Sequence, residues 1–179
     1  MKKLAGKKIA ILAIDGFELS ELVEPKKALE EAGAEVKVVS LEIGEIRGWI
    51  RRDWADYVKV DLTLTETKVE DFDALHLPGG LLNPDILRTK KEAVDFVKQF
   101  FAANKTVSAI CHAPWILINA DCVKGKTVTS YISLKKDLEN AGAKWVDEEV
   151  VVDGLLITSR KPSDLPVFIQ KIIEIIANQ

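Results

Sequence analysis

The chain has 179 residues, of which 47% are hydrophobic and 30% are charged, and its formal net charge is −3. This length and composition predict one globular domain over residues 1–179, large enough to bury about 70% of the surface that the unfolded chain exposes. The weakly negative charge and the scattered Lys and Arg residues argue against a nucleic-acid partner. No run of about 18 apolar residues predicts a membrane span, and the short apolar run after the basic start does not fit a signal peptide. We therefore expect a cytoplasmic protein.

The first half of the chain predicts strands that alternate with helices. Unbroken apolar runs are typical of strands covered on both faces of a parallel sheet. We expect Pro25 to interrupt the first helix and Gly33 to close it. The expected elements are a strand at residues 8–14, a helix at 19–32, a strand at 36–39, a short antiparallel pair at 46–49 and 58–60, and a strand at 74–77.

The second half continues the same alternation. The expected elements are a helix at residues 92–104, a strand at 106–110, a helix at 134–141, a hairpin at 150–158 with Asp153-Gly154 at its turn, and a last helix with an apolar stripe over 165–176. Ser163 is the expected N-cap of that last helix. This order predicts an α/β fold with a doubly wound, mostly parallel sheet between helices, in which ligands bind beyond the carboxyl ends of the strands.

One cysteine lies where such a fold places reactive groups. Cys111 follows the buried strand at 106–110, and Pro114 suits the first turn of a following helix. A thiol in this strand–turn–helix context faces the free N–H groups of the helix start, which favour thiolate over thiol. We therefore expect a lowered pKa and a nucleophilic sulfur. Without that context we would expect Cys111 to be a buried structural thiol. Cys122 has no comparable setting and is expected to be structural or incidental.

Two other segments should meet Cys111 at the same rim of the sheet. Glu18 and Glu21 follow the first strand, and Gly79 and Gly80 follow the strand at 74–77. A protonated carboxyl beside the sulfur could donate to the thiolate, whereas a charged one would raise the thiol pKa. The glycine turn and the N–H of His112 could bind a developing oxyanion. The alternative for the two glutamates is an ordinary role as acids of a helix's first turn.

His112 is the expected base for Cys111, although neighbours at a helix start point in different directions, so a third group would have to orient its ring. His76 lies inside an apolar strand and is expected to be a core histidine. Trp115 is either a packing residue or part of an aromatic rim around the thiol pocket. With two cysteines and two histidines and no CxxC pair, the sequence predicts neither a metal site nor a disulfide, and no cofactor motif is present.

Three motifs resemble the ThiJ/PfpI superfamily, and in particular its PfpI branch. They are Asp-Gly-Phe-Glu-Leu-Ser-Glu-Leu at 15–22, Leu-Pro-Gly-Gly at 77–80, and Ala-Ile-Cys-His-Ala-Pro at 109–114. The resemblance runs from about residue 8 to the last helix. It implies a flavodoxin-like sandwich similar to class I glutamine amidotransferases, with Cys111 on a nucleophile elbow and no cofactor.

The resemblance also implies roles for individual residues. Glu21 matches the acid that forms a hydrogen bond with the cysteine sulfur, and His112 matches the histidine of the catalytic group. In the peptidase branch an acid from a neighbouring subunit completes a triad, and Asp85 is the nearest equivalent here, one position later than expected. Arg51 stands where relatives often carry a pocket histidine, which would favour anionic or dicarbonyl ligands. A homo-oligomer, either a dimer or a hexamer, is implied as well.

Several functions fit this pattern. We favour cofactor-free thiolate chemistry of the glyoxalase or deglycase type, in which Cys111 adds to a small reactive carbonyl or acts on a glycated substrate in stress protection. An intracellular cysteine peptidase is the first alternative. The second is a non-enzymatic redox sensor or chaperone, in which Cys111 is oxidised to a sulfinate.

Overall fold

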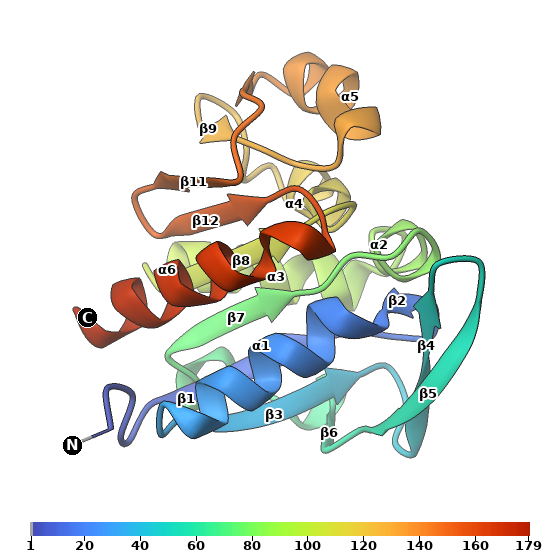
Figure 1. The fold of residues 1–179 in the computed structure, drawn as a ribbon, viewed down its shortest axis with the longest axis vertical. Helices are drawn as coiled ribbons and strands as arrows, with labels where there is room; N and C mark the ends of the chain where they lie inside the picture. Colours follow the sequence, from blue (N-terminus) through green and yellow to red (C-terminus); the bar gives the residue numbers. More distant parts are fainter. Residues whose placement is uncertain (1) are drawn as a thin grey trace.

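The computed structural model describes residues 2–179 and contains a seven-stranded central sheet (Figure 1). In sheet order its strands are β11 (Val150–Asp153), β12 (Leu156–Ser159), β8 (Thr106–Ile110), β7 (Ala74–Leu77), β1 (Lys8–Leu12), β3 (Glu35–Ser40) and β6 (Leu62–Thr63). All neighbouring strands pair in parallel except β11 and β12, which form an antiparallel hairpin at one edge. The predicted mostly parallel, flavodoxin-like sheet is confirmed.

Helices cover both faces of this sheet, because alternate strand residues point to opposite sides. One face packs α1 (Leu19–Glu31) and α6 (Leu165–Ala177) onto residues such as Ile9 and Ile11. The other face packs α3 (Lys91–Ala102) and α4 (Pro114–Asn119) onto residues such as Ala10 and Leu12. Two hydrophobic cores result, one on each side of the sheet.

Smaller elements lie around the main sheet. They are the three-stranded sheet of β2 (Phe17–Glu18), β4 (Glu45–Ile50) and β5 (Asp53–Lys59), the pair β9 (Thr127–Val128) and β10 (Lys144–Trp145), the helices α2 (Leu82–Leu87) and α5 (Lys135–Asn140), and the 3-10 turns Leu64–Glu66, Val69–Asp71, Ile132–Leu134 and Pro162–Asp164. The predicted antiparallel excursion is the β4–β5 hairpin, which projects from one end of the molecule in Figure 1. No helix within residues 2–179 is long and apolar enough to cross a membrane.

Pro25 does not interrupt the first helix, contrary to the expectation from the sequence. Proline has no N–H, so the carbonyl of Glu21, four residues earlier, loses its usual helical partner. The ring of His76 replaces that partner, with its Nε2 2.8 Å from the Glu21 carbonyl oxygen. The other ring nitrogen lies 3.0 Å from the Ser108 hydroxyl. Burial lowers the pKa of His76 to about 4, so its ring is neutral at pH 7 and has the role of a satisfied core histidine.

Two local predictions for the C-terminal segment are wrong in detail. The β11–β12 turn consists of Gly154 and Leu155, and Asp153 is the last residue of its strand. Its carboxylate accepts hydrogen bonds from the Thr127 N–H and the Lys126 ammonium, which keeps Asp153 in the strand. Ser163 does not cap α6, because it lies inside the 3-10 turn that leads into that helix.

Candidate active site

Cys111 occupies the turn between β8 and α4, and this turn is strained. Its backbone has φ +63°, a left-handed conformation that costs a residue with a side chain about 1–2 kcal/mol. The surrounding chain holds it there: the Cys111 N–H donates to the Ser159 carbonyl at 3.1 Å, and the Cys111 carbonyl accepts from Tyr131 N at 2.9 Å. The side chain is buried, with 7% of the residue exposed. The predicted nucleophile-elbow geometry is therefore present.

His112 contacts the sulfur even though the two residues are adjacent in the chain. Its Nδ1 lies 3.1 Å from Cys111 Sγ. The contact is feasible because α4 begins only at Pro114, so neither residue follows helical side-chain directions. The imidazole ring is stacked on Tyr131, with centroids 4.8 Å apart, and meets Trp115 edge-on at 5.3 Å. Burial lowers the pKa of His112 below its usual 6.5, so the ring is neutral at pH 7 and can accept a proton.

Glu21 is fully buried beside the sulfur. One carboxyl oxygen accepts a hydrogen bond from Gly79 N at 2.9 Å. The other has no hydrogen-bond partner within the described residues. Burial, and then repulsion from Glu18, raise the pKa of Glu21 to about 8. At pH 7 the carboxyl is therefore mostly protonated, which is the state in which an acid can donate to a thiolate.

The prediction of a lowered thiol pKa is wrong. Burial and the charge of an ionised Glu21 raise the pKa of Cys111 well above its usual value, although the backbone N–H groups of His112 and Gly80 act in the opposite direction. The two N–H groups do not outweigh the loss of water around the sulfur. Protonation of Glu21 removes the repulsive charge and supplies a donor, so ionisation of Cys111 becomes easier when Glu21 is neutral. The group that contacts the sulfur and can accept its proton is His112 Nδ1.

The glycine turn brings these groups together by allowing close backbone approach. A Cβ on Gly79 would lie 2.6 Å from a Glu21 carboxyl oxygen and 2.7 Å from the Cys111 Cβ. Gly80 has φ +81°, and a Cβ there would lie 2.2 Å from the Gly16 carbonyl oxygen. Because the Gly79 N–H is bonded to Glu21, the donors left near the sulfur for a developing oxyanion are those of Gly80 and His112.

Glu18 has a structural role next to this turn. Its carboxylate caps α1 by accepting from Glu21 N at 3.0 Å, and it also accepts from the Ser20 hydroxyl at 2.5 Å. The helix-cap alternative from the sequence thus describes Glu18, whereas Glu21 points into the site. The difference depends on which side of the first helical turn each side chain occupies, and the sequence does not reveal that.

Two other predicted site residues lie apart from the sulfur within this chain. Asp85 pairs with Arg88 at 2.6 Å on exposed α2 and makes no hydrogen bond to His112. Arg51 is exposed at the β4–β5 turn with φ +57°, and its side chain forms no ion pair or hydrogen bond in residues 2–179. Trp115, by contrast, is part of the site: it contacts His112, donates to Asp137 at 2.8 Å, and carries the Arg88 guanidinium 4.7 Å above its ring.

Sequence reasoning missed two residues that touch His112. Tyr131 stacks on the ring, and Ser133 places its hydroxyl 3.3 Å from Nε2. Both come from the segment around the 3-10 turn Ile132–Leu134, which follows α4 and β9. No sequence motif identifies Tyr131 and Ser133, because their position beside His112 depends on the backbone hydrogen bond from Tyr131 N to the Cys111 carbonyl.

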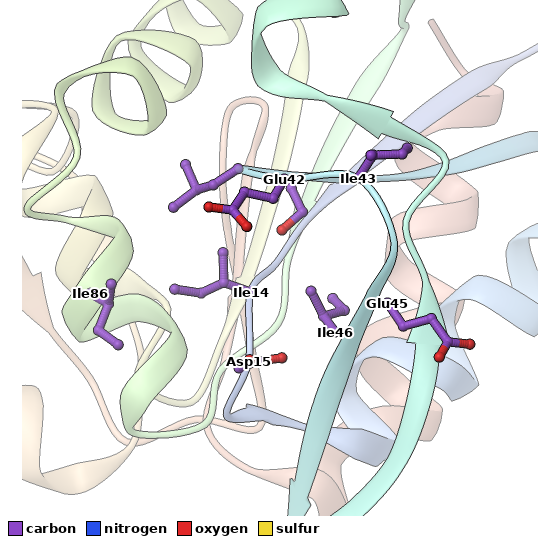
Figure 2. Close-up of a pocket in the computed structure, with 9 residues that line it drawn as sticks. Ile14, Asp15, Glu42, Ile43, Glu45, Ile46 and Ile86 are labelled. Atoms are coloured by element: carbon purple, nitrogen blue, oxygen red, sulfur yellow. The ribbon is translucent and has the colours of Figure 1, made fainter.

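Two hollows lie near the rim, and neither is lined by Cys111 itself. One is a cavity of about 290 Å³. Its wall combines the apolar side chains of Ile14, Ile46 and Ile86 with the carboxylates of Asp15, Glu42 and Glu45 (Figure 2). A second, mainly apolar hollow of about 230 Å³ is lined by Gly16, Trp49, Leu81 and Leu82. It adjoins the glycine turn, since Gly16 approaches Gly80.

Metal-ligating residues do not cluster within residues 2–179: no group of three or more His, Cys, Asp or Glu side chains there could hold a metal ion. The functional side chains at the site are instead one thiol, one imidazole and one carboxyl.

The chain matches known proteins over most of its length. The model of the DJ-1/PfpI family matches residues 7–175. Deglycase TK1284 of Thermococcus kodakarensis is 42% identical over 94% of this chain and 99% of its own length. The Bacillus subtilis protein named "Putative cysteine protease YraA" is 46% identical, covering 90% of this chain and 94% of its own. The crystal structure of Drosophila melanogaster DJ-1beta has a TM-score of 0.87 at 31% identity, covering 97% of this chain and 91% of that one.

Proposed function

Because the chain belongs to the DJ-1/PfpI family, we propose that it is a cysteine-dependent enzyme that converts small reactive carbonyl compounds, by glyoxalase- or deglycase-type chemistry. The observation that carries the proposal is the 3.1 Å contact between Cys111 Sγ and His112 Nδ1, on a strained turn that faces a protonated carboxyl. Relatives named deglycase, at about two fifths identity, support the same class of reaction.

The first step uses groups already in contact. The Cys111 thiol gives its proton to His112 Nδ1, and the sulfur forms a bond to the aldehyde carbon of a 2-oxoaldehyde. The aldehyde oxygen takes the proton from the His112 imidazolium, which gives a hemithioacetal and returns the ring to its neutral form. While negative charge develops on that oxygen, the N–H groups of Gly80 and His112 are the nearest backbone donors.

The second step rearranges the bound substrate without an external oxidant. The hydrogen on the sulfur-bearing carbon leaves as a proton, and a proton is delivered to the neighbouring carbonyl carbon. The proton of the hemithioacetal hydroxyl moves to the neighbouring oxygen at the same time. One carbon is thereby oxidised to a thioester and the other reduced to an alcohol. Glu21 and His112 are the groups available to carry these protons. Water then cleaves the thioester, which releases a 2-hydroxy acid and restores the thiol.

The shape of the site favours small substrates. Cys111 is 7% exposed, so a reacting carbon must approach through a narrow opening. The apolar hollow lined by Gly16, Trp49 and Leu82 adjoins the glycine turn and suits the methyl group of a compound such as methylglyoxal. A folded polypeptide loop would need more open access to the sulfur than this chain provides.

The test is conversion of methylglyoxal to lactate by the purified protein. We expect turnover by the unaltered chain, a loss of at least about a thousandfold in Cys111→Ser, and unchanged turnover in Cys122→Ser as the matched control. Circular dichroism and thermal unfolding establish that Cys111→Ser remains folded. Retained turnover in folded Cys111→Ser would reject the proposal.

A peptidase is the second candidate, and the name of the 46% identical Bacillus subtilis relative favours it. It predicts cleavage of casein or of a fluorogenic peptide that also depends on Cys111. Peptide cleavage without methylglyoxal turnover would replace the carbonyl proposal with this one.

We also propose that the chain works as a homo-oligomer. Exposed apolar side chains occur on α2 and on the β4–β5 hairpin, and they include Leu81, Leu82, Ile50, Trp54 and Tyr57. Such exposed side chains on a small protein often belong to an interface.

A further inference from the structure

His112 lacks a carboxylate partner, and this raises the question of what orients its ring. Within residues 2–179 no Asp or Glu forms an ion pair with it, and burial alone accounts for its lowered pKa. A catalytic imidazole whose second nitrogen is unconstrained can present the wrong tautomer to the nucleophile. The only side-chain group that bonds its second nitrogen among the described residues is the hydroxyl of Ser133, 3.3 Å from Nε2.

We propose that Ser133 is the positioning residue for His112, holding the imidazole in the tautomer that carries its proton on Nε2. In that tautomer Nε2–H donates to the Ser133 hydroxyl oxygen, and the lone pair of Nδ1 faces Cys111 Sγ at 3.1 Å. Ser133 then does for His112 what an acid does in a Ser-His-Asp triad, without adding a charge. This inference rests on the proposed function in that it assigns His112 the role of base.

The segment that carries Ser133 is fixed to the nucleophile itself. Tyr131 N donates to the Cys111 carbonyl at 2.9 Å, and Leu134 N donates to the Tyr131 carbonyl at 3.0 Å. The side chain of Leu134 is fully buried and anchors the 3-10 turn Ile132–Leu134 in the core. The Ser133 hydroxyl is therefore held at a defined position relative to the turn of Cys111.

The imidazole plane is also fixed on both sides, so the hydroxyl meets a ring of known orientation. Tyr131 stacks at an interplanar angle of 24°, and Trp115 meets the ring at 61°. Trp115 is itself held by its hydrogen bond to Asp137. With rotation of the ring restricted, the remaining freedom of His112 is the choice of tautomer. The Cys111 thiol is a donor toward an unprotonated Nδ1, and the Ser133 hydroxyl is then placed to accept from Nε2–H.

A neutral partner has a chemical consequence that a carboxylate would not have. A carboxylate at Nε2 would stabilise the imidazolium and raise the pKa of His112. A hydroxyl leaves the ring neutral at pH 7 and therefore available to accept a proton. Replacement of Ser133 by Asp is accordingly expected to raise the pKa of His112 and shift the acid side of the activity profile upward.

The test reads the tautomer directly by proton–nitrogen NMR of protein labelled in histidine. The chain has two histidines, so the spectrum contains two rings, and His112→Gln assigns them. We expect the Nε2–H tautomer for His112 in the unaltered protein and in Ser133→Thr, and a mixture of tautomers in Ser133→Ala. Ser163→Ala, which removes an exposed hydroxyl that contacts Asp164, serves as the control and should leave the His112 signals unchanged.

Kinetics provide the second readout. We expect Ser133→Ala to lower kcat for methylglyoxal roughly tenfold with KM changed less than about twofold, and Ser133→Thr to restore most of the rate. An Nδ1–H tautomer in the unaltered protein, or identical His112 signals in Ser133→Ala, would overturn the inference. If methylglyoxal is not converted at all while the tautomer responds to Ser133, the proposed function fails and the positioning role stands.

Discussion

At the scale of single residues, the unusual property of this site is a glutamate that keeps its proton at neutral pH. Glu21 loses its water on folding and gains one backbone hydrogen bond, from Gly79. This single bond does not replace the hydration of a charged carboxylate, so the neutral form is favoured. The neighbouring thiol is buried with it, and neither group ionises easily while the other is charged. In the proposed mechanism it is therefore His112 that removes the thiol proton.

This arrangement predicts a bell-shaped dependence of kcat/KM on pH. Below the lowered pKa of His112, under 6.5, the base is protonated and the rate falls. Near pH 8 Glu21 loses its proton, its charge opposes ionisation of Cys111, and the rate falls again. Glu21→Gln, which cannot ionise, should keep the acid side of the profile and lose the decline near pH 8. A wild-type rate that rises through pH 8 to a plateau would contradict this mechanism.

The raised pKa of Glu21 also lowers the stability of the folded protein at neutral pH. The pKa of Glu21 rises from 4.5 in the unfolded chain to about 8, so the folded state keeps a proton that the unfolded state releases. The favourable contribution of this bound proton to the free energy of unfolding is fully present below pH 4.5 and is lost as pH rises to 8. At pH 7 we expect Glu21→Gln to be more stable than the unaltered protein by up to roughly 3 kcal/mol, and only slightly more stable at pH 5. Urea unfolding at the two pH values measures this, and an equal difference at both would disprove it.

At the scale of elements, α1 and β7 are joined by an interaction that the sequence does not reveal. Pro25 frees the Glu21 carbonyl, and His76 of β7 bonds to it. We expect His76→Leu to destabilise the protein by about 1–3 kcal/mol, because a buried carbonyl is left unpaired. In a Pro25→Ala background the backbone N–H gained at this position can bond that carbonyl, so the cost should fall by roughly 1 kcal/mol. A double-mutant cycle by urea unfolding measures the coupling, and strict additivity would refute it.

The turn after β7 gives a second prediction at this scale. Gly80 has φ +81° and faces backbone atoms of Gly16 and Glu18, whereas Gly125 has φ +76° and open space around it. Gly125→Ala should therefore cost only the backbone strain, about 1 kcal/mol, while Gly80→Ala should cost clearly more because the Gly16 and Glu18 backbones must move. Equal losses in thermal stability for the two variants would show that the close approach at Gly80 is unimportant.

The strands, helices and their order could be predicted because apolar runs and glycine positions reflect burial directly. The position of Cys111 in the turn followed from the same pattern. Other features depend on contacts between distant segments and were missed: the continuation of α1 through Pro25 requires His76, and the ring of His112 is held by Tyr131 and Ser133. The direction of the Cys111 pKa was missed because the sequence indicates nearby donors but not the depth of burial.

At the scale of the whole molecule, the position of Asp85 raises the question of whether a neighbouring subunit contributes to the active site. Asp85 is paired with Arg88 and exposed, so it could serve a catalytic histidine only in another subunit. We expect light scattering after gel filtration to give a mass of two or six chains, since α2 and the β4–β5 hairpin expose apolar side chains. A monomer at micromolar concentration would contradict this expectation.

The assembly also determines whether Asp85 takes part in the reaction. Because Ser133 already bonds the second nitrogen of His112 within the chain, we expect Asp85→Asn to lower kcat/KM for methylglyoxal less than about threefold. Ser133→Ala measured alongside gives the comparison. A loss in Asp85→Asn larger than the loss in Ser133→Ala would assign the orienting role to the acid of a neighbouring subunit.

The most direct test of the proposed mechanism is the ionisation of Glu21, followed by carbon-13 NMR of the side-chain carboxyl in protein labelled in glutamate. Glu21→Gln identifies the resonance by its absence. We predict that this carboxyl remains protonated at pH 7 and titrates near pH 8. A titration near 4.5, the ordinary value for glutamate, would place a negative charge beside Cys111 at neutral pH and contradict the mechanism proposed for this site.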